Sequence, residues 1–138
     1  MLKIVLGVIA GFVAWSILWV GSDQLLMTAS PNWYGAHQLK FALAMANQEL
    51  FNADATILIM HIVRSIIISI MAGFLAAFIA GENRRAPLIL GVLLLLFGLM
   101  VEVMVWSYLP VWYHLIFLAL LVPMTVLGGK FKKVPAMQ

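Results

Sequence analysis

Residues 54–81, DATILIMHIVRSIIISIMAGFLAAFIAG, decide the fold class of this chain. The run that follows Asp54 is apolar over the length of about 20 residues that a helix needs to span a bilayer. It nevertheless carries His61 and Arg64, one helical turn apart. A charge at bilayer depth costs roughly 2.5–3.5 kcal/mol on insertion scales. The stretch therefore predicts a membrane-spanning helix whose arginine has a polar partner within the protein.

The composition of the whole chain is typical of a membrane protein. Of its 138 residues 65% are hydrophobic and 9% are charged, whereas a soluble domain is about half apolar and a quarter charged. We expect a single all-α integral membrane domain over residues 1–138. The absence of cysteine excludes disulfides and thiolate metal sites. The net charge of +3 comes from basic residues beside the apolar runs, so topology explains it and no nucleic-acid partner is expected.

Apolar runs and turn residues predict a four-transmembrane-helix up-down bundle. The expected helices cover residues of about 4–23, 55–80, 87–106 and 111–127. The first run also resembles a secretory signal peptide in its basic start, but it is longer than the apolar region of most signal peptides and favours a retained helix.

The segments between and after these helices have their own expectations. Residues 24–53 are expected to form an external loop, with a short external interfacial helix where apolar residues recur at helical spacing between His37 and Phe51. Gly128 and Gly129 are expected to end the last helix, so that residues 128–138 form a cytoplasmic tail.

The distribution of basic residues predicts the orientation of the bundle. Lys40 falls on one side of the membrane. The opposite side has Lys3, Arg84, Arg85, Lys130, Lys132 and Lys133. The positive-inside rule then places both termini in the cytoplasm, with the chain in a plasma or inner membrane.

Depth along the helices suggests a partner for Arg64. In a hairpin with its tip near Asn83, Arg64 and Glu102 lie equally far from the tip, and Glu102 is the only carboxylate within another apolar run. We therefore predict an intramembrane ion pair between them. It has two interpretations that the sequence leaves open: a structural pair that holds the hairpin in register, or part of a functional site.

The same depth argument gathers further ionisable residues near the outer boundary. Asp23, His61 and His114 all reach this level, which predicts an outward-facing polar cluster and a candidate ligand site. His61 and His114 could also be axial ligands of a b-type haem. No metal-ligand spacing is present, so no metal is expected.

Small residues recur at spacings that let helix backbones approach closely. The candidate packing positions are Gly7, Gly11, Ser65, Ser69, Gly73, Ala77, Gly91 and Gly98.

The functional expectation follows from these packing positions and from missing motifs. The sequence has no nucleophile–base constellation, phosphate loop or dinucleotide fingerprint, so enzymatic activity and a cofactor are not expected. The leading hypothesis is a small accessory subunit that packs against itself or other membrane subunits within the lipid bilayer. The alternative is a transporter or ligand-binding bundle that uses the polar cluster for a proton-linked substrate, a quinone, a lipid or b-haem.

Overall fold

The computed structural model describes residues 1–133, and within them the chain is helical with short connections and no β-strand. The elements in chain order are α1 (Leu2–Ala29), the π-helical turn η1 (Pro31–Gly35), α2 (Ala36–Asn47), α3 (Ala55–Ala80), α4 (Arg85–Met104), the 3-10 turn η2 (Trp106–Tyr108) and α5 (Val111–Lys130). Residues 134–138 of the predicted tail lie outside the described residues.

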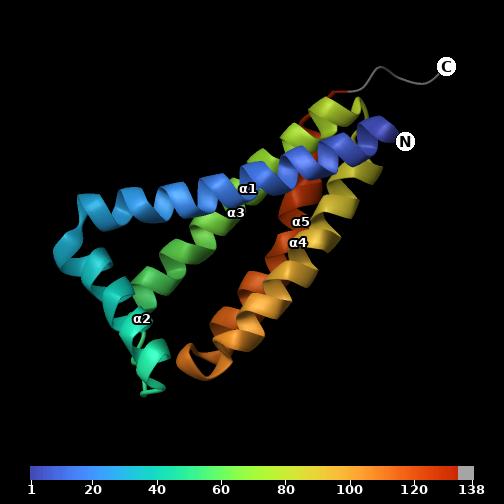
Figure 1. The fold of residues 1–138 in the computed structure, drawn as a ribbon. Coiled ribbons are helices and arrows are strands. Elements are labelled where there is room, and N and C mark those ends of the chain that lie inside the picture. The colour runs from blue at the N-terminus through green and yellow to red at the C-terminus, as the bar shows by residue number, and fades with distance from the viewer. Residues whose placement is uncertain (134–138) are drawn as a thin grey trace.

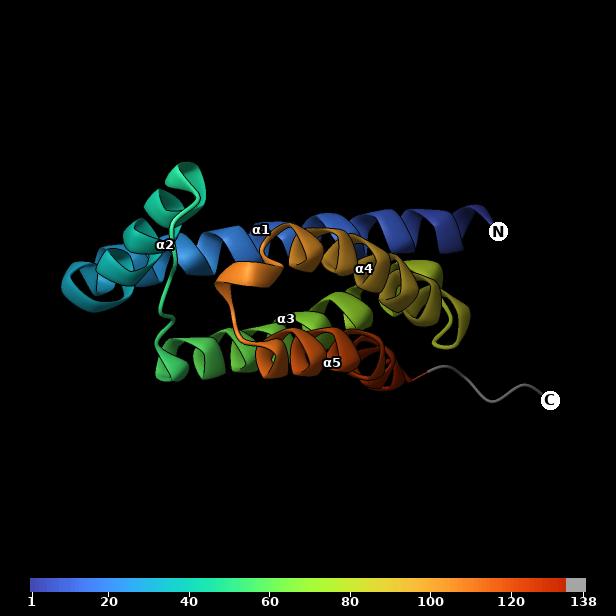
Figure 2. The same cartoon turned by 90° about the horizontal axis from the view of Figure 1, so that it is seen from below.

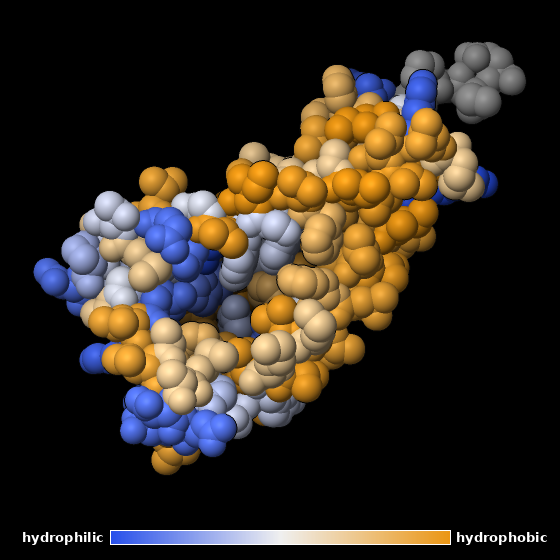
Figure 3. Space-filling model, viewed as in Figure 1, coloured by the Kyte–Doolittle hydropathy of each residue, from blue (hydrophilic) through white to orange (hydrophobic). Residues whose placement is uncertain are grey.

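Four helices, α1, α3, α4 and α5, are long and apolar enough to cross a membrane. Their number and approximate positions agree with the four predicted spans, and they are compatible with a small multi-pass membrane protein. Large apolar side chains cover much of their outer surface (Figure 3). In water such a surface would be unfavourable, whereas lipid tails solvate it.

Two helix ends differ from the prediction. α1 continues beyond residue 23 to Ala29 and ends only before Pro31, since no strong helix breaker intervenes. α5 continues through Gly128 and Gly129 to Lys130, so the prediction that these glycines end it is wrong. Both glycines are buried against neighbouring segments, and this tertiary packing outweighs their weak helix propensity.

Successive long helices alternate in direction (Figure 1). The N-terminus, the α3–α4 turn and the end of α5 share one end of the molecule, and α2 and the α4–α5 connection lie at the other, called the α2 end below (Figures 1 and 2). α3 packs mainly against α5 and α1, and the main neighbour of α4 is α5. The central helix is therefore α3.

The turn between α3 and α4 is built from local hydrogen bonds. Gly81 ends α3 with a φ of 70°, a left-handed conformation that glycine adopts without steric cost. The Glu82 carboxylate then accepts from the backbone N–H groups of Arg84, Arg85 and Ala86, at 2.6–2.9 Å. Burial alone would raise the pKa of Glu82, but these hydrogen bonds together lower it. The carboxylate thus caps the N-terminus of α4 in its charged form.

Glycines on α1, α3 and α5 allow close helix contacts. A Cβ added at Gly7 would lie 2.5 Å from the carbonyl oxygen of Ala76, so α1 approaches the backbone of α3 there. A Cβ at Gly73 would clash with the backbone of Thr125, and one at Gly128 would clash with the backbone of Ile70. α3 and α5 therefore meet backbone to backbone.

The other small residues of the predicted packing set also face neighbouring helices. A Cβ at Gly11 would meet the backbone of α3, and Gly91 and Gly98 lie against side chains or backbone of α5. Ala77 and Ser65 are buried on α3. Ser69 is buried too, and its hydroxyl accepts a 3.0 Å hydrogen bond from the Trp15 indole of α1. These positions are therefore occupied by contacts within a single chain.

The contact at Gly73 predicts a stability difference between two glycine variants. Gly73→Ala should destabilise the protein by roughly 1–3 kcal/mol, because the new methyl group forces α3 and α5 apart. The control is Gly21→Ala on α1, where an added Cβ meets nothing within 4 Å. This change should be neutral or stabilising by about 0.5–1 kcal/mol. Unfolding in mixed detergent micelles measures both, and equal stabilities for the two variants would contradict the packing described.

Candidate functional site

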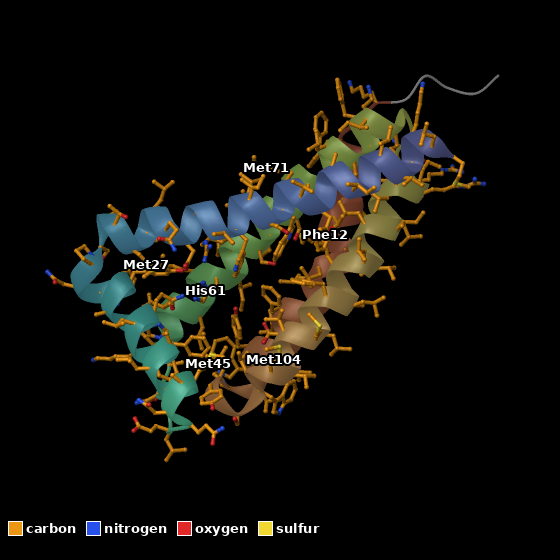
Figure 4. The ribbon with its side chains drawn as sticks, in the orientation of Figure 1. Phe12, Met27, Met45, His61, Met71 and Met104 are labelled. Atoms are coloured by element: carbon orange, nitrogen blue, oxygen red, sulfur yellow. The ribbon has the colours of Figure 1, made fainter. Side chains whose placement is uncertain are left out.

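A cavity of about 190 Å³ opens at the α2 end of the bundle. Its polar or aromatic lining includes Trp19, Asp23, His37, His61, Glu102 and Tyr113. Figure 3 shows polar side chains gathered at the α2 end around a hollow, and Figure 4 shows His61 on α3 in the space between α1, α2 and the α4–α5 pair. This volume holds several water molecules, but it lies below the roughly 300–1,000 Å³ of drug-sized ligand pockets.

Arg64, on the same helix as His61, directs its guanidinium toward α1. Nε and Nη2 donate to the Ser22 hydroxyl at 3.0 and 2.8 Å, and Nη2 also donates to the Trp19 carbonyl oxygen at 2.7 Å. Its central carbon lies 4.2 Å from the centroid of the Trp19 ring. The C-terminal half of α1 thus supplies both the hydrogen-bond acceptors and an aromatic face for this cation.

The remaining donor nitrogen of Arg64, Nη1, connects it to two further residues. It donates to the Tyr34 hydroxyl at 3.0 Å and to Nδ1 of His61 at 2.8 Å. Tyr34 in turn donates to Asp23 Oδ1 at 2.5 Å, and Gln38 Nε2 donates to the same oxygen at 3.3 Å. Tyr34 therefore bridges a cation and a carboxylate that do not touch each other.

Tyr34 is completely buried, which fits its bridging role. Burial, together with the hydrogen bond to Asp23, raises the pKa of Tyr34 far above its usual value of 10.0. The phenol therefore stays protonated, so that it donates a hydrogen bond to Asp23 and accepts one from Arg64. The sequence did not single out Tyr34 for this role, since its only signal was an aromatic residue after the Ser30–Pro31 turn.

Glu102 contacts His114 rather than Arg64. The Glu102 Oε2 and His114 Nδ1 atoms are hydrogen-bond partners, and His114 Nε2 donates to the Trp106 carbonyl oxygen at 3.1 Å. The imidazole is completely buried and stacks on the Trp106 ring at a centroid distance of 4.4 Å. Glu102 thus belongs to a group formed by α4, η2 and α5.

The predicted Arg64–Glu102 ion pair is wrong, because within residues 1–133 no salt bridge joins the two side chains. The depth estimate placed them level but assumed that α3 and α4 face each other directly. α3 instead packs against α1 and α5, so Arg64 points toward α1 while Glu102 points toward α5. The polar cluster is consequently divided into two hydrogen-bonded groups.

Both groups contribute side chains to the same cavity. The first brings Asp23 and His61 from the predicted cluster to its wall, and the second brings Glu102. The Tyr113 ring lies between the two predicted haem ligands, with its centroid 6.3 Å from that of His61 and 6.0 Å from that of His114. No group of three potential metal-ligating side chains occurs in the described part of the chain.

The start of α3 is tied to η1 and α2 by Asp54. Its carboxylate accepts from the Trp33 indole at 3.1 Å and from the Thr56 backbone N–H at 2.9 Å, and its own N–H donates to His37 Nε2 at 3.1 Å. The hydrogen bonds from Trp33 and then Thr56 lower the pKa of Asp54. These contacts hold α2 beside the cavity.

Comparisons of this chain with protein-family models, with curated proteins and with solved structures found no match.

The contacts of Arg64 predict that a lysine cannot replace it. Arg64→Lys should destabilise the protein by roughly 1–3 kcal/mol, because a lysine has fewer donors and no planar group to lie on Trp19. Detergent unfolding monitored by tryptophan fluorescence measures the loss. Arg84→Lys is the matched control in the α3–α4 turn, and a loss as large as that for Arg64→Lys would refute the special role of Arg64.

The lowered pKa of Asp54 predicts that its hydrogen bond with Trp33 depends on pH. Because its pKa is lower in the folded protein than its ordinary value of 3.8, ionised Asp54 stabilises the fold above that pH, and this contribution disappears as the pH falls through the lowered pKa. The indole N–H resonance of Trp33, assigned with Trp33→Phe, should shift over this acidic range. Asp54→Asn should remove the titration, and an unchanged titration in this variant would assign it to another group.

Proposed function

We propose that this chain is a small multi-pass membrane protein, without enzymatic activity, that binds a small ligand as a transporter or receptor. The observation that carries the proposal is the cavity at the α2 end, where polar and aromatic side chains of five helices line a space of about 190 Å³. Burying so many polar groups in an apolar bundle costs free energy, so such groups are expected to serve either stability or function. Because the cavity is open on one side, we favour a role in ligand binding over a purely structural one.

The distribution of basic residues indicates from which side of the membrane a ligand reaches the cavity. The described basic residues beside the spans, apart from Lys40, gather at the end opposite α2. By the positive-inside rule that end is cytoplasmic, and the α2 end with its cavity faces outward. α2 then lies at the outer surface as the predicted interfacial helix, beside the mouth of the cavity. Ligand would enter from the outside.

The competing proposal, an accessory packing subunit, has less support. It was motivated by stripes of small residues that could receive a partner helix. Gly7 packs against α3, Gly11 packs against both α3 and α4, and Gly73 packs against α5 of the same chain. The helix surface that remains exposed is apolar, and contact with lipid is enough to explain this composition without a partner helix. Chemical cross-linking in nanodiscs that captures a defined oligomer would favour the accessory subunit instead.

The volume of the cavity also limits the size of the ligand. Its volume favours a small molecule over a haem or a quinone, which need pockets at least as large as those for drug-sized ligands. Haem ligation by His114 would further have to break its contacts with Glu102 and Trp106. We therefore propose that no haem is bound.

Adjacent residues of α3 provide a test, because the chain has no cysteine of its own. Leu58 lines the cavity and is only 1% exposed, whereas Ile59 is 55% exposed on the outer face of the same helix. In membrane vesicles, Leu58→Cys should react with a water-soluble, membrane-impermeant maleimide, because water enters the cavity. Ile59→Cys should remain unlabelled, because lipid covers it.

The two variants separate the alternatives. Labelling of Ile59→Cys without labelling of Leu58→Cys is the order expected from surface exposure in a soluble protein, and it would refute the proposal. Labelling of Leu58→Cys only in vesicles of inverted orientation would keep the cavity but reverse the proposed direction of access.

A further inference from the structure

We infer that the ligand of this cavity is a small organic cation, with a protonated amine held by the Asp23 carboxylate and by the Oε1 atom of Glu102, and with an apolar body against the remaining wall. This inference rests on the proposed function of the cavity. It concerns the chemical class of ligand, which the proposed function leaves open.

The side chains with carboxyl groups that line the cavity are Asp23 and Glu102, and no lysine or arginine is among its lining residues. Asp23 supplies the negative charge, since Glu102 shares a proton with His114, and Glu102 supplies a further acceptor oxygen. Each carboxylate uses one oxygen for protein hydrogen bonds, Oδ1 in Asp23 and Oε2 in Glu102. The other oxygens, Oδ2 and Oε1, have no hydrogen-bond partner within residues 1–133. They are not sealed off, since Ser65 Oγ is the one fully enclosed side-chain atom there without a partner.

Arg64 does not neutralise these carboxylates directly. All three of its nitrogens already donate to partners in α1, η1 and His61, and its face is covered by the Trp19 ring. It reaches Asp23 only through the Tyr34 hydroxyl. Oδ2 of Asp23 is therefore left for a cation from outside the protein.

The two histidines of the cavity wall are neutral, as their hydrogen bonds require. An arginine can only donate, so Nδ1 of His61 must accept from Arg64 and cannot carry a proton. In the same way Nε2 of His37 accepts from the Asp54 N–H, and its Nδ1 donates to the Gln38 side chain at 3.0 Å. Neither ring adds a positive charge that would attract an anion.

The rest of the wall favours an organic cation over a metal ion. Phe41, Leu58, Val101, Val105 and Leu109 offer apolar surface, which binds hydrocarbon and does not ligate metal. A metal ion would need several oxygen or nitrogen ligands at short range, and no group of three such side chains occurs in the described residues. An ammonium group fits the carboxylates, and the nearby Tyr113 ring attracts cations through its face.

The test compares three probes of similar shape and different charge. Phenethylammonium, 2-phenylethanol and phenylacetate are titrated by calorimetry into the protein in nanodiscs, with empty nanodiscs as the blank. Phenethylammonium should bind at least roughly tenfold more tightly than the alcohol, since a hydrogen bond to a charged group contributes about 1.5–3 kcal/mol. Phenylacetate should bind most weakly.

Variants of the carboxylates make the test specific. Asp23→Asn keeps an acceptor for Tyr34, and Asp23→Asn and Glu102→Gln should each raise the Kd of phenethylammonium by roughly 10- to 100-fold. Glu49→Gln removes a carboxylate outside the lining of this cavity and should leave the Kd unchanged. A thermal unfolding scan of each variant shows whether a loss of binding reflects a loss of folding.

The outcomes separate the inference from the proposed function. Equal or tighter binding of the alcohol or of phenylacetate overturns the cationic ligand, as does a folded Asp23→Asn variant that binds phenethylammonium like the wild type. Failure of all three probes also overturns it. In that case, labelling of Leu58→Cys decides whether the ligand cavity of the proposed function survives.

Discussion

The burial of the Arg64 guanidinium is the interaction on which the α2 end of this molecule depends. A cation within an apolar helix has to be surrounded by acceptors, because no water replaces them there. α1 provides these acceptors through the Trp19 carbonyl and Ser22, which requires α1 to run past the point where its apolar stretch weakens. The chain then reverses through η1 and brings the Tyr34 hydroxyl to the same guanidinium. One cation on α3 thus connects this helix to both α1 and η1.

Backbone contact at glycines sets the other end of the arrangement. Gly73 and Gly128 let α3 and α5 meet closely, and Gly7 lets α1 lie on the other side of α3. With both neighbours of α3 determined in this way, α4 is left to pack mainly against α5. These crossings lie toward the end opposite α2, and toward the α2 end α1 spreads away from the α4–α5 pair (Figure 1). The cavity lies where the helices diverge.

The divergence explains why the polar residues form two groups instead of one. Asp23 and Tyr34 belong to the α1 side and hydrogen-bond toward Arg64, while Glu102 and His114 form their own contact on the α4–α5 side. Each group satisfies its own buried atoms, so neither needs the other for stability. What they share is the space between them, and a small cation that meets both carboxylates would connect them. The structure and the proposed function are therefore linked at the cavity between the two groups.

The sequence by itself determined the all-helical fold, the four apolar helices and the set of polar residues near one end, because hydropathy and helical rise are local properties that add along the chain. It did not determine which of these polar side chains form hydrogen bonds with one another. Depth placed Arg64 level with Glu102, yet depth contains no information on rotation about the helix axis or on which helices are neighbours. The ends of α5 show the same limit, since two glycines that favour termination stay helical when packed. Only the tertiary structure, through close packing at a few glycines and the need to satisfy one buried cation, decided that Arg64 bonds to α1 and Tyr34 and that a cavity separates it from Glu102.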